Sequence, residues 1–496
     1  MFQTAFCFSQ SILEVEYQLE AFEGSTEQAL GFVQEYWECE FIYTNLVDLN
    51  QKSQLEPGVY SLRQVLDSLL IPNKIDYKVN DNTIVLVPSS QQRRGKIEII
   101  GKVVDEKNVP ISFASVYFKG TPIGTISNAN GDFVIVIPDS LLLTNLSITS
   151  LGYEQVEINP NNYLKESPTI VLKQNRIKLE KVLVRPKNPE QLITLSLEKR
   201  KENYATTPLL YYGFFRETSQ QEDNYISLAE AIIEIYKKPY LNTGQDLVKI
   251  SRGRVGENIS NARGINLIMK GGVFNLIQLD IVKYPVSFYS KEELVLYNYY
   301  MDKSILYKGR QTYVIRFKPK ETTEVLSFEG KMYFDVETLG LARVEFEIPV
   351  RYMRQAYQLL IDKISSGFRA KPLVASYEMD YRFYNNKWHI SHARGEVKIK
   401  AKSKRRTRQN FSCVFTSYSE FVVTNQVNYP EKTFKIKDAS TRSDIVVEQL
   451  KTVQPIHWQG ENVILPNEPL EKTIKRLSES NELRSYFNIE SDELYK

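Results

Sequence analysis

The sequence Ile97-Glu-Ile-Ile-Gly-Lys-Val-Val-Asp105 opens the most regularly patterned segment of the chain, and Ser127-Asn-Ala-Asn-Gly-Asp-Phe133 and Ser150-Leu-Gly-Tyr153 follow within it. Apolar residues in this segment recur with a period of two, which is the period of a strand with one buried face. They are Val103, Val116, Phe118, Phe133, Ile135, Ile137, Ile148 and Val156. Turn residues such as Asn130-Gly131 separate the runs. The pattern therefore predicts short antiparallel strands in a small β-sandwich.

This segment resembles the carboxypeptidase regulatory-like domain, a transthyretin-like β-sandwich. The resemblance rests on GKVVDEKNVPISFASVYFKGT at 101–121, GTISNANGDFVIVIP at 124–138 and SLGY at 150–153. It implies a sandwich over residues 97–176. The family is named for a domain appended to carboxypeptidases, so the resemblance implies no catalytic activity.

The histidines exclude the peptidase chemistry itself. A zinc carboxypeptidase needs a histidine with a carboxylate three residues on, and a distant second histidine, because catalytic Zn²⁺ takes three protein ligands. The residues three positions after His389, His392 and His457 are His392, Gly395 and Gly460, so no His-x-x-Glu occurs. His389 and His392 lie on a predicted strand, where a spacing of three sends the rings to opposite faces. We therefore expect no metal site and no cofactor.

Composition bounds the class of protein. At 496 residues the chain is longer than one hydrophobic core usually serves, which predicts several domains. Aromatic residues reach 12%, led by 31 tyrosines, which favours the half-buried strands of β-rich envelope proteins. A net charge of +3 gives no global field for binding nucleic acid. Cys7, Cys39 and Cys413 are too few for a disulfide framework, and the lack of a long apolar run predicts no transmembrane helix.

The first ten residues, Met-Phe-Gln-Thr-Ala-Phe-Cys-Phe-Ser-Gln, have no basic n-region. They are too short for a whole signal peptide but match the last part of one, with the small Ser9 before the mature start. We interpret residues 1–10 as a signal-peptide remnant behind a truncated start, and expect the protein in the periplasm or associated with the outer membrane. The alternative is a disordered cytoplasmic N-terminus.

Residues 11–90 alternate between strand and helix patterns. Ser25 and Ser61 each precede a helix with one apolar face, and a hairpin follows across Asn80-Asp-Asn82. This arrangement resembles the secretin and TonB short N-terminal domain. Members of that family dock protein partners in the periplasm, so the resemblance implies an envelope protein partner bound through residues 11–90.

The rest of the chain divides at Arg185-Pro-Lys-Asn-Pro189, since the two prolines disfavour helix on their N-terminal side. We expect a linker and helix over 177–205, a β-rich C-terminal domain over 206–430 and a tail with a short helix over 431–496. The stretch Tyr211-Tyr-Gly-Phe-Phe-Arg-Glu217 resembles the C-terminal regions found behind this sandwich in envelope proteins of the Bacteroidetes type. Those regions have no assigned chemistry.

Hairpin patterns dominate the predicted β-rich domain. Gly330–Asp335 pairs with Leu341–Ile348, and Ser376–Phe383 pairs with Lys387–Ala401 across Asn385-Asn386. Such a meander favours one large antiparallel sheet, similar to the half-barrel lipoprotein-carrier folds that wrap a lipid-sized cavity. The predicted fold class is α+β and mostly β: a small αβ N-terminal domain, a transthyretin-like sandwich, and a half-barrel-like C-terminal sheet with a helical tail.

A cluster of cations is the first candidate site. It comprises Lys398, Lys400, Lys402, Lys404, Arg405, Arg406 and Arg408. Spacing of two sends the four lysines to one face of a strand, toward phosphates of lipopolysaccharide, acidic lipid headgroups or nucleic acid. Nucleic acid is disfavoured because no aromatic stacking platform interleaves the run. The alternative is a solvated edge strand whose lysines prevent aggregation.

Arg216, Glu217 and Glu230 lie in otherwise apolar sequence. A buried carboxylate there needs a cationic partner or a raised pKa. We therefore expect a buried pair between Arg216 and Glu230, which either holds two strands in register or orients a ligand headgroup.

Recognition domains in series without a catalytic constellation favour a binding protein over an enzyme. The leading hypothesis is a non-catalytic cell-envelope protein whose C-terminal β domain holds a lipid, glycan or protein ligand. One alternative is an envelope hydrolase that uses C-terminal carboxylates, which two carboxylates roughly 5 to 9 Å apart in a pocket would favour. Another is signalling through residues 1–90 to an inner-membrane regulator.

Overall fold

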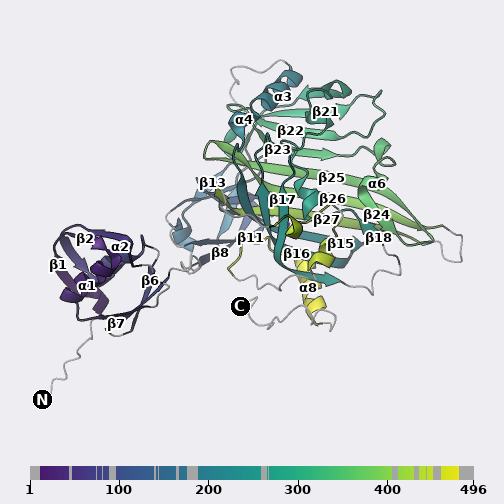
Figure 1. The fold of residues 1–496 in the computed structure, drawn as a ribbon. Helices are drawn as coiled ribbons and strands as arrows, with labels where there is room; N and C mark the ends of the chain where they lie inside the picture. The colour runs from purple at the N-terminus through teal and green to yellow at the C-terminus, as the bar shows by residue number, and fades with distance from the viewer. Residues whose placement is uncertain are drawn as a thin grey trace. The chain divides into compact units, whose positions relative to one another are not determined.

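The computed structural model describes residues 12–479, except for 44–46, 48, 74, 81, 89–95, 139–140, 143, 164–166, 176–187, 258–264, 266, 405–410, 429–434, 443 and 451–459. The chain divides into two compact units, Met1–Lys96 and Ile97–Lys496 (Figure 1). The predicted signal-peptide remnant, residues 1–10, lies outside the described residues.

The first unit combines two helices with short strands. Its elements are η1 (Ile12–Glu14), β1 (Glu16–Leu19), β2 (Phe22–Ser25), α1 (Thr26–Tyr36), β3 (Glu40–Ile42), β4 (Lys52–Leu55), β5 (Gly58–Ser61), α2 (Leu62–Leu70), β6 (Ile75–Asn80) and β7 (Thr83–Pro88). Ser25 and Ser61 form reciprocal caps with Gln28 and Gln64, which start α1 and α2 as the sequence predicts. Both helices turn their apolar faces into one core, in which Val33 is fully buried.

The second unit begins with the sandwich. Its strands are β8 (Lys96–Asp105), β9 (Ser115–Phe118), β10 (Gly124–Ile126), β11 (Asp132–Pro138), β12 (Leu146–Thr149), β13 (Val156–Ile158) and β14 (Thr169–Leu172). They form two sheets, in the orders β10-β9-β12-β13 and β11-β8-β14. The predicted alternating residues fill the space between the sheets, with Phe118, Phe133 and Ile148 fully buried. Gly131 has a φ of 81°, and a side chain at this position would collide with the carbonyl oxygen of Val103.

A large antiparallel sheet follows. Its strands are β15 (Leu209–Gln221), β16 (Asn224–Lys237), β17 (Leu247–Glu257), β19 (Tyr297–Met301), β20 (Ile305–Tyr307), β21 (Arg310–Pro319), β22 (Glu329–Asp335), β23 (Leu341–Glu347), β25 (Phe368–Tyr384), β26 (Lys387–Ser403) and β27 (Ser412–Asn428). The order is β17-β16-β15-β27-β26-β25-β23-β22-β21-β19, with β20 pairing β21, so β17 and β19 are the edges. The mostly β fold class is thereby confirmed.

Shorter elements connect and cover these strands. They are η3 (Pro160–Tyr163), α3 (Pro189–Glu198), α4 (Arg200–Asn203), β18 (Leu267–Met269), α5 (Val273–Ile277), η5 (Ser287–Tyr289), η6 (Leu294–Leu296), η7 (Val350–Tyr352), α6 (Tyr357–Leu360), β24 (Ile361–Ile364), η8 (Ile436–Asp438), α7 (Val446–Leu450) and α8 (Glu468–Glu479). The helix predicted in the tail corresponds to α8. The predicted hairpin between β25 and β26 is also present, and its turn residues Asn385 and Asn386 both have positive φ, as a type I′ turn requires.

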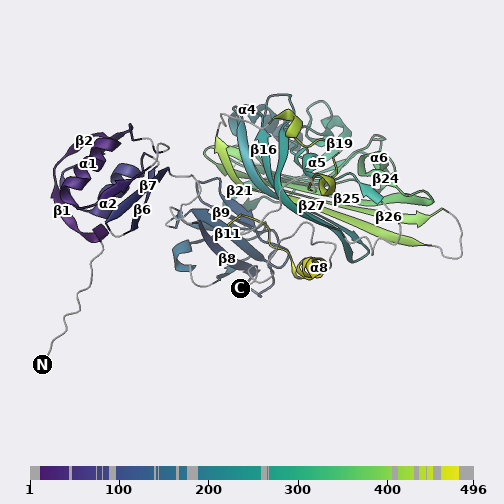
Figure 2. The same cartoon turned by 60° about the horizontal axis from the view of Figure 1, so that its bottom comes forward.

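The two faces of the large sheet have different covers (Figure 2). Phe214 and Phe215 are neighbours on β15 and therefore point to opposite faces. Phe215 packs in the main core with Tyr289 of η5 and Ile277 of α5, whereas Phe214 packs with Ile126 of the sandwich. The sandwich therefore lies on one face, which we call the sandwich face, and the segment that carries α5 and η5 fills the other.

Candidate functional site

Charged side chains occupy one line of register across the sandwich face. From β17 to β21 this line, which we call the charge ladder, reads Arg254, Glu230, Arg216, Glu420, Arg394, Glu378, Glu345, Lys331 and Arg316. Each residue is directly opposite the next one on the adjacent strand, so all nine share a face. The charges alternate in sign as far as Glu378.

One half of the charge ladder is buried. The Nε atom of Arg216 lies 2.7 Å from Oε1 of Glu230, and Arg254 binds the other carboxylate oxygen. The side chain of Glu230 is only 1% exposed. Burial opposes ionisation of Glu230, but the two guanidinium groups more than offset it, so the pKa of this carboxyl is lowered. The structure thus brings the predicted Arg216 and Glu230 together in the interior.

A C-terminal segment, Glu461–Pro466, covers this half. Arg216 donates hydrogen bonds from Nη2 to the carbonyl oxygen of Ile464 at 2.6 Å and from Nη1 to that of Leu465 at 3.3 Å. On the sandwich side, Asn462 accepts from the N–H of Val136 and donates to its carbonyl oxygen. The segment therefore joins the sandwich to the sheet through hydrogen bonds to both.

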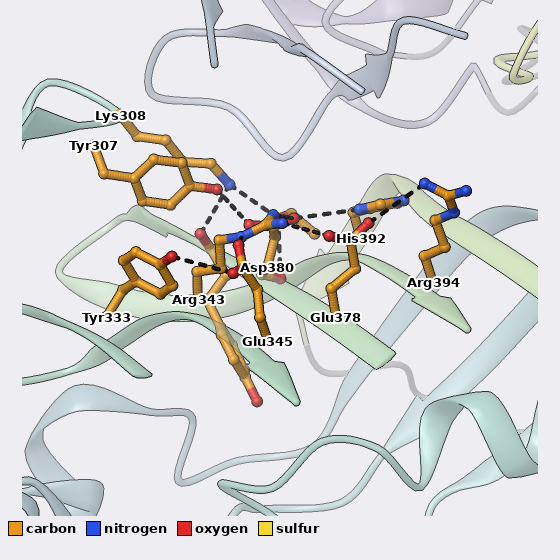
Figure 3. Close-up of polar contacts among 11 residues, drawn as sticks. Tyr307, Lys308, Tyr333, Arg343, Glu345, Glu378, Asp380, His392 and Arg394 are labelled. Atoms are coloured by element: carbon orange, nitrogen blue, oxygen red, sulfur yellow. Dashed lines mark hydrogen bonds and ion pairs between the residues drawn. The ribbon is translucent and has the colours of Figure 1, made fainter. Parts of the chain in front are cut away.

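The other half of the charge ladder is organised by Arg343, which sequence reasoning missed (Figure 3). Its Nε donates to Glu345 and its Nη1 to Asp380, both at 2.7 Å, and its Nη2 donates to Glu378. Glu345 and Glu378 are directly opposed like charges, which would repel without this shared cation. One guanidinium thus holds three carboxylates on two strands.

Asp380 is the buried centre of this network. It accepts a hydrogen bond from Tyr307, and His392 Nδ1 lies 3.3 Å from its Oδ2. Burial opposes ionisation of Asp380, but Arg343 and Lys308 more than offset it and hold its pKa well below the usual range. Burial also lowers the pKa of Lys308 to about 8, despite the attraction of Asp380.

The two histidines of β26 correct one prediction. Asp380 is opposite His392 and Arg382 is opposite His389, with Ser391 as an extra residue between them. Asp380 and Arg382 are two residues apart and share a face, so their partners also share it. The prediction of opposite faces is wrong because this β-bulge changes the alternation of β26.

Phe113 of the sandwich borders the network. Its ring stacks on His392 with the centroids 6.2 Å apart, and the guanidinium of Arg394 lies 4.4 Å from its ring centre. Phe113 has a φ of 56°, a conformation that bulky residues rarely adopt. The sandwich therefore meets the charge ladder at Arg394, where its buried half ends.

A groove of about 360 Å³ opens beside this border. It is lined by Glu329, Gly330, Lys331, Glu345, Phe346, Glu347, Ser376, Tyr377, Glu378, Arg394 and Glu396, so five carboxylates face two cationic side chains. Glu329 and Glu347 are directly opposed across β22 and β23. Neither has an ion-pair partner within the described part of the chain. The groove thus offers uncompensated negative charge.

The predicted cation cluster lies at the other end of β26. Lys398 pairs with Glu396 at 2.8 Å, while Lys400 is opposite Lys371 and Lys402 is opposite Arg369. We call Arg369, Lys371, Lys398, Lys400 and Lys402 the basic stripe. Lys404 follows β26 and is exposed, and Arg405, Arg406 and Arg408 lie outside the described residues. The edge-strand interpretation is wrong, because β26 pairs with β25 and β27 along its lysines.

A second buried cation also escaped sequence reasoning. Lys237 is completely buried and lies 2.7 Å from Asp246, with Asp280 as a second partner. Burial opposes the charge on Lys237, but the two aspartates more than offset it and raise its pKa. Tyr381 donates a hydrogen bond to Asp280 at 2.6 Å. The partners of these charged side chains therefore come from the protein itself, and we interpret the group as structural.

The described residues contain no group of three or more His, Cys, Asp or Glu side chains arranged to hold a metal ion. None of their helices is long and apolar enough to cross a lipid bilayer.

Two protein-family models match parts of this chain. Residues 99–184 match the CarboxypepD_reg-like domain, and residues 39–89 match the Secretin and TonB N terminus short domain. The resemblances of these two segments to the carboxypeptidase regulatory-like domain and to the secretin and TonB short N-terminal domain are confirmed. The matched domains are regulatory or docking modules rather than catalytic ones, and the second is typical of cell-envelope proteins. A comparison with curated proteins finds no match.

Several solved structures share a local likeness. A domain proposed to be an outer membrane lipoprotein-sorting protein, from Vibrio parahaemolyticus, is 10% identical, covering 48% of this chain and 93% of its own, with a TM-score of 0.22. A DUF1329 family protein from Desulfovibrio piger is 10% identical, covering 49% and 94%, with a TM-score of 0.21. A LolA superfamily protein from Nitrosomonas europaea is 7% identical, covering 48% and 95%, with a TM-score of 0.17. Likeness at this level carries no argument about function.

Proposed function

We propose that this chain is a non-catalytic binding protein of the cell envelope. In this proposal the C-terminal sheet holds a protein ligand in the groove beside the charge ladder, and residues 11–90 dock a second envelope protein. The observation that carries the proposal is the directly opposed pair Glu329 and Glu347, which lines an open groove without a cationic partner in the described residues.

The charge of the groove selects the ligand class. Like charges directly opposite on neighbouring strands destabilise a sheet, so a ligand that brings positive charge between them relieves a cost the free protein carries. Glu345 and Glu378 are already tied to Arg343, which leaves Glu329 and Glu347 for the ligand. We therefore propose a polar segment with lysine or arginine side chains.

The interior of the sheet supports this choice over a lipid carrier. The face opposite the sandwich is packed with side chains of the chain itself, among them Phe288, Tyr289 and Tyr297, all fully buried. Phe288 stacks on Phe317 of β21 with the ring centres 4.1 Å apart. An acyl chain would have to displace this packing, whereas a charged segment finds the groove already open.

Calorimetric titration with a short lysine-rich peptide tests the proposal, with the same peptide acetylated on its lysines as the neutral control. E329Q/E347Q is expected to weaken binding about five- to tenfold, as loss of two exposed ion pairs implies. E106Q/E293Q removes two exposed carboxylates elsewhere and should bind like the unsubstituted protein. Equal binding of both peptides, or equal loss in both variants, contradicts the proposal.

A hydrolase is the second candidate, because the same groove holds two opposed carboxylates and glycosidases use such pairs. Release of reducing sugar from cell-wall glycan would support this alternative. Its loss in E347Q, with peptide binding absent in the unsubstituted protein, would replace the binding proposal.

A further inference from the structure

Four of the five cations of the basic stripe lie on a part of the sheet that only three strands form; they are Arg369, Lys371, Lys400 and Lys402. Pairing between β25 and β23 stops at Ser376, and pairing between β27 and β15 stops at Phe415. Beyond these points β25, β26 and β27 continue as a three-stranded extension, which projects past the neighbouring strands in both views (Figures 1 and 2).

The two faces of this extension differ in chemistry. Along β26, Ile399 and Ala401 are fully buried on the inner face, where Cys413 and Phe415 of β27 join them. Lys398, Lys400 and Lys402 alternate with these residues and therefore point to the opposite face, which we call the outer face. The extension is thus covered on one face and basic on the other.

The cations of the outer face repel one another. Lys371 is opposite Lys400 and Arg369 is opposite Lys402, and like charges in this arrangement destabilise a sheet. Lys398 has Glu396 as its partner. The other four cations of the stripe have no ion-pair partner within the described residues. Protection of an edge does not explain Lys400 and Lys402, because β26 has a neighbour on each side.

We propose that the basic stripe docks this protein on an anionic phospholipid surface. The stripe is two adjacent rows on a sheet, with residues about 7 Å apart along a strand and strands about 5 Å apart. A flat array of positive charges meets many phosphate headgroups of a bilayer at once, and positive charge near such a surface is attracted to it. The inference goes beyond the groove and does not depend on it.

Cosedimentation with vesicles tests this inference. The unsubstituted protein is expected to pellet with phosphatidylcholine vesicles containing one quarter phosphatidylglycerol at low salt, and to be released at high salt. K400Q/K402Q should weaken this binding roughly 25-fold, since each cation near an anionic surface contributes about a fivefold effect. K107Q/K303Q removes two exposed lysines outside the stripe and should change binding less than about twofold.

Several outcomes would overturn the inference: no binding to anionic vesicles, equal binding to pure phosphatidylcholine, or equal loss in K107Q/K303Q. Binding to soluble heparin without binding to vesicles would overturn the lipid assignment as well. E329Q/E347Q should still bind vesicles like the unsubstituted protein, so failure of the groove proposal and failure of this one are distinguishable. Unchanged circular dichroism of each variant establishes that its fold is intact.

Discussion

Arg216 on β15 and Glu230 on β16 are directly opposed and share a hydrogen bond of 2.7 Å beneath the segment Glu461–Pro466. Arg254 binds the same carboxylate from β17. Two guanidinium groups therefore share one buried carboxylate, and Arg216 has Glu420 as a second partner at 3.4 Å.

Neutralising this carboxylate is expected to be severe. E230Q removes the carboxylate that Arg216 and Arg254 share in the interior, and removing one partner of a buried ion pair typically costs about 3–5 kcal/mol. The free energy of unfolding, measured by denaturant titration, should fall by that amount. R252Q removes a partly exposed pair with Glu461 and should cost less than about 1 kcal/mol. Similar losses in the two variants would show that burial does not increase the contribution of the Glu230 ion pairs to stability.

Acid is expected to destabilise the fold through His389. Burial, with the charge of Arg382 nearby, lowers the pKa of His389 from 6.5 to about 3. Between these values the unfolded chain binds a proton that the folded chain does not, so stability falls as the pH falls through this window. Between about pH 7 and about pH 5 this histidine should remove about 2 kcal/mol.

H389Q should lose that part of the pH dependence, whatever its stability at neutral pH. Denaturant titrations of both proteins at the two pH values provide the measurement. The same decline in H389Q as in the unsubstituted protein would assign the effect to other groups.

A groove carboxylate should be replaceable with a gain in stability. E347Q removes the repulsion between Glu347 and Glu329 and is expected to raise the free energy of unfolding by about 0.2–1 kcal/mol. E347D keeps the charge and serves as the control, with no gain expected. A loss of stability in E347Q would mean that Glu347 has a favourable interaction in the free protein.

The turn at Gly131 should tolerate no side chain. In G131A the new methyl group meets the carbonyl oxygen of Val103, in addition to the cost of a positive φ. The expected loss is more than about 2 kcal/mol, read from thermal unfolding. Gly120 also has a positive φ, of 73°, but open space around it, so G120A should cost only about 1 kcal/mol.

Local patterns in the sequence predicted much of this fold. The sandwich follows from its period of two and its Asn-Gly turn, and the hairpin of β25 and β26 follows from Asn385 and Asn386, because such turns join neighbours in sequence. Pairing of β15 with β27 joins residues about 200 positions apart, for which no local pattern exists. The charge ladder depends on that strand order and therefore could not be predicted from the sequence.

The candidate site also has parts that local sequence predicts and parts that it does not. The alternating lysines of β26 were visible as a pattern, since they lie two apart on one strand. The role of Arg343 was not, because its partners Glu378 and Asp380 come from another strand and their register is set by tertiary pairing. The extra residue at Ser391 places one histidine on the opposite face of the sheet from the one predicted, and no neighbouring residue signals a β-bulge there.

The segment Glu461–Pro466 has a consequence for biogenesis. Arg216 is bonded to Ile464, a residue translated 248 positions later, so the sandwich and the strands of the sheet are synthesised before the segment that hydrogen-bonds to both. Until then the apolar side chains of Phe214 and Ile126 lack the cover that Val463 and Ile464 give them. A ribosome stalled before this segment would therefore carry a sandwich and a sheet that can touch through Phe113 and Arg394 but lack the hydrogen bonds that the segment adds to both.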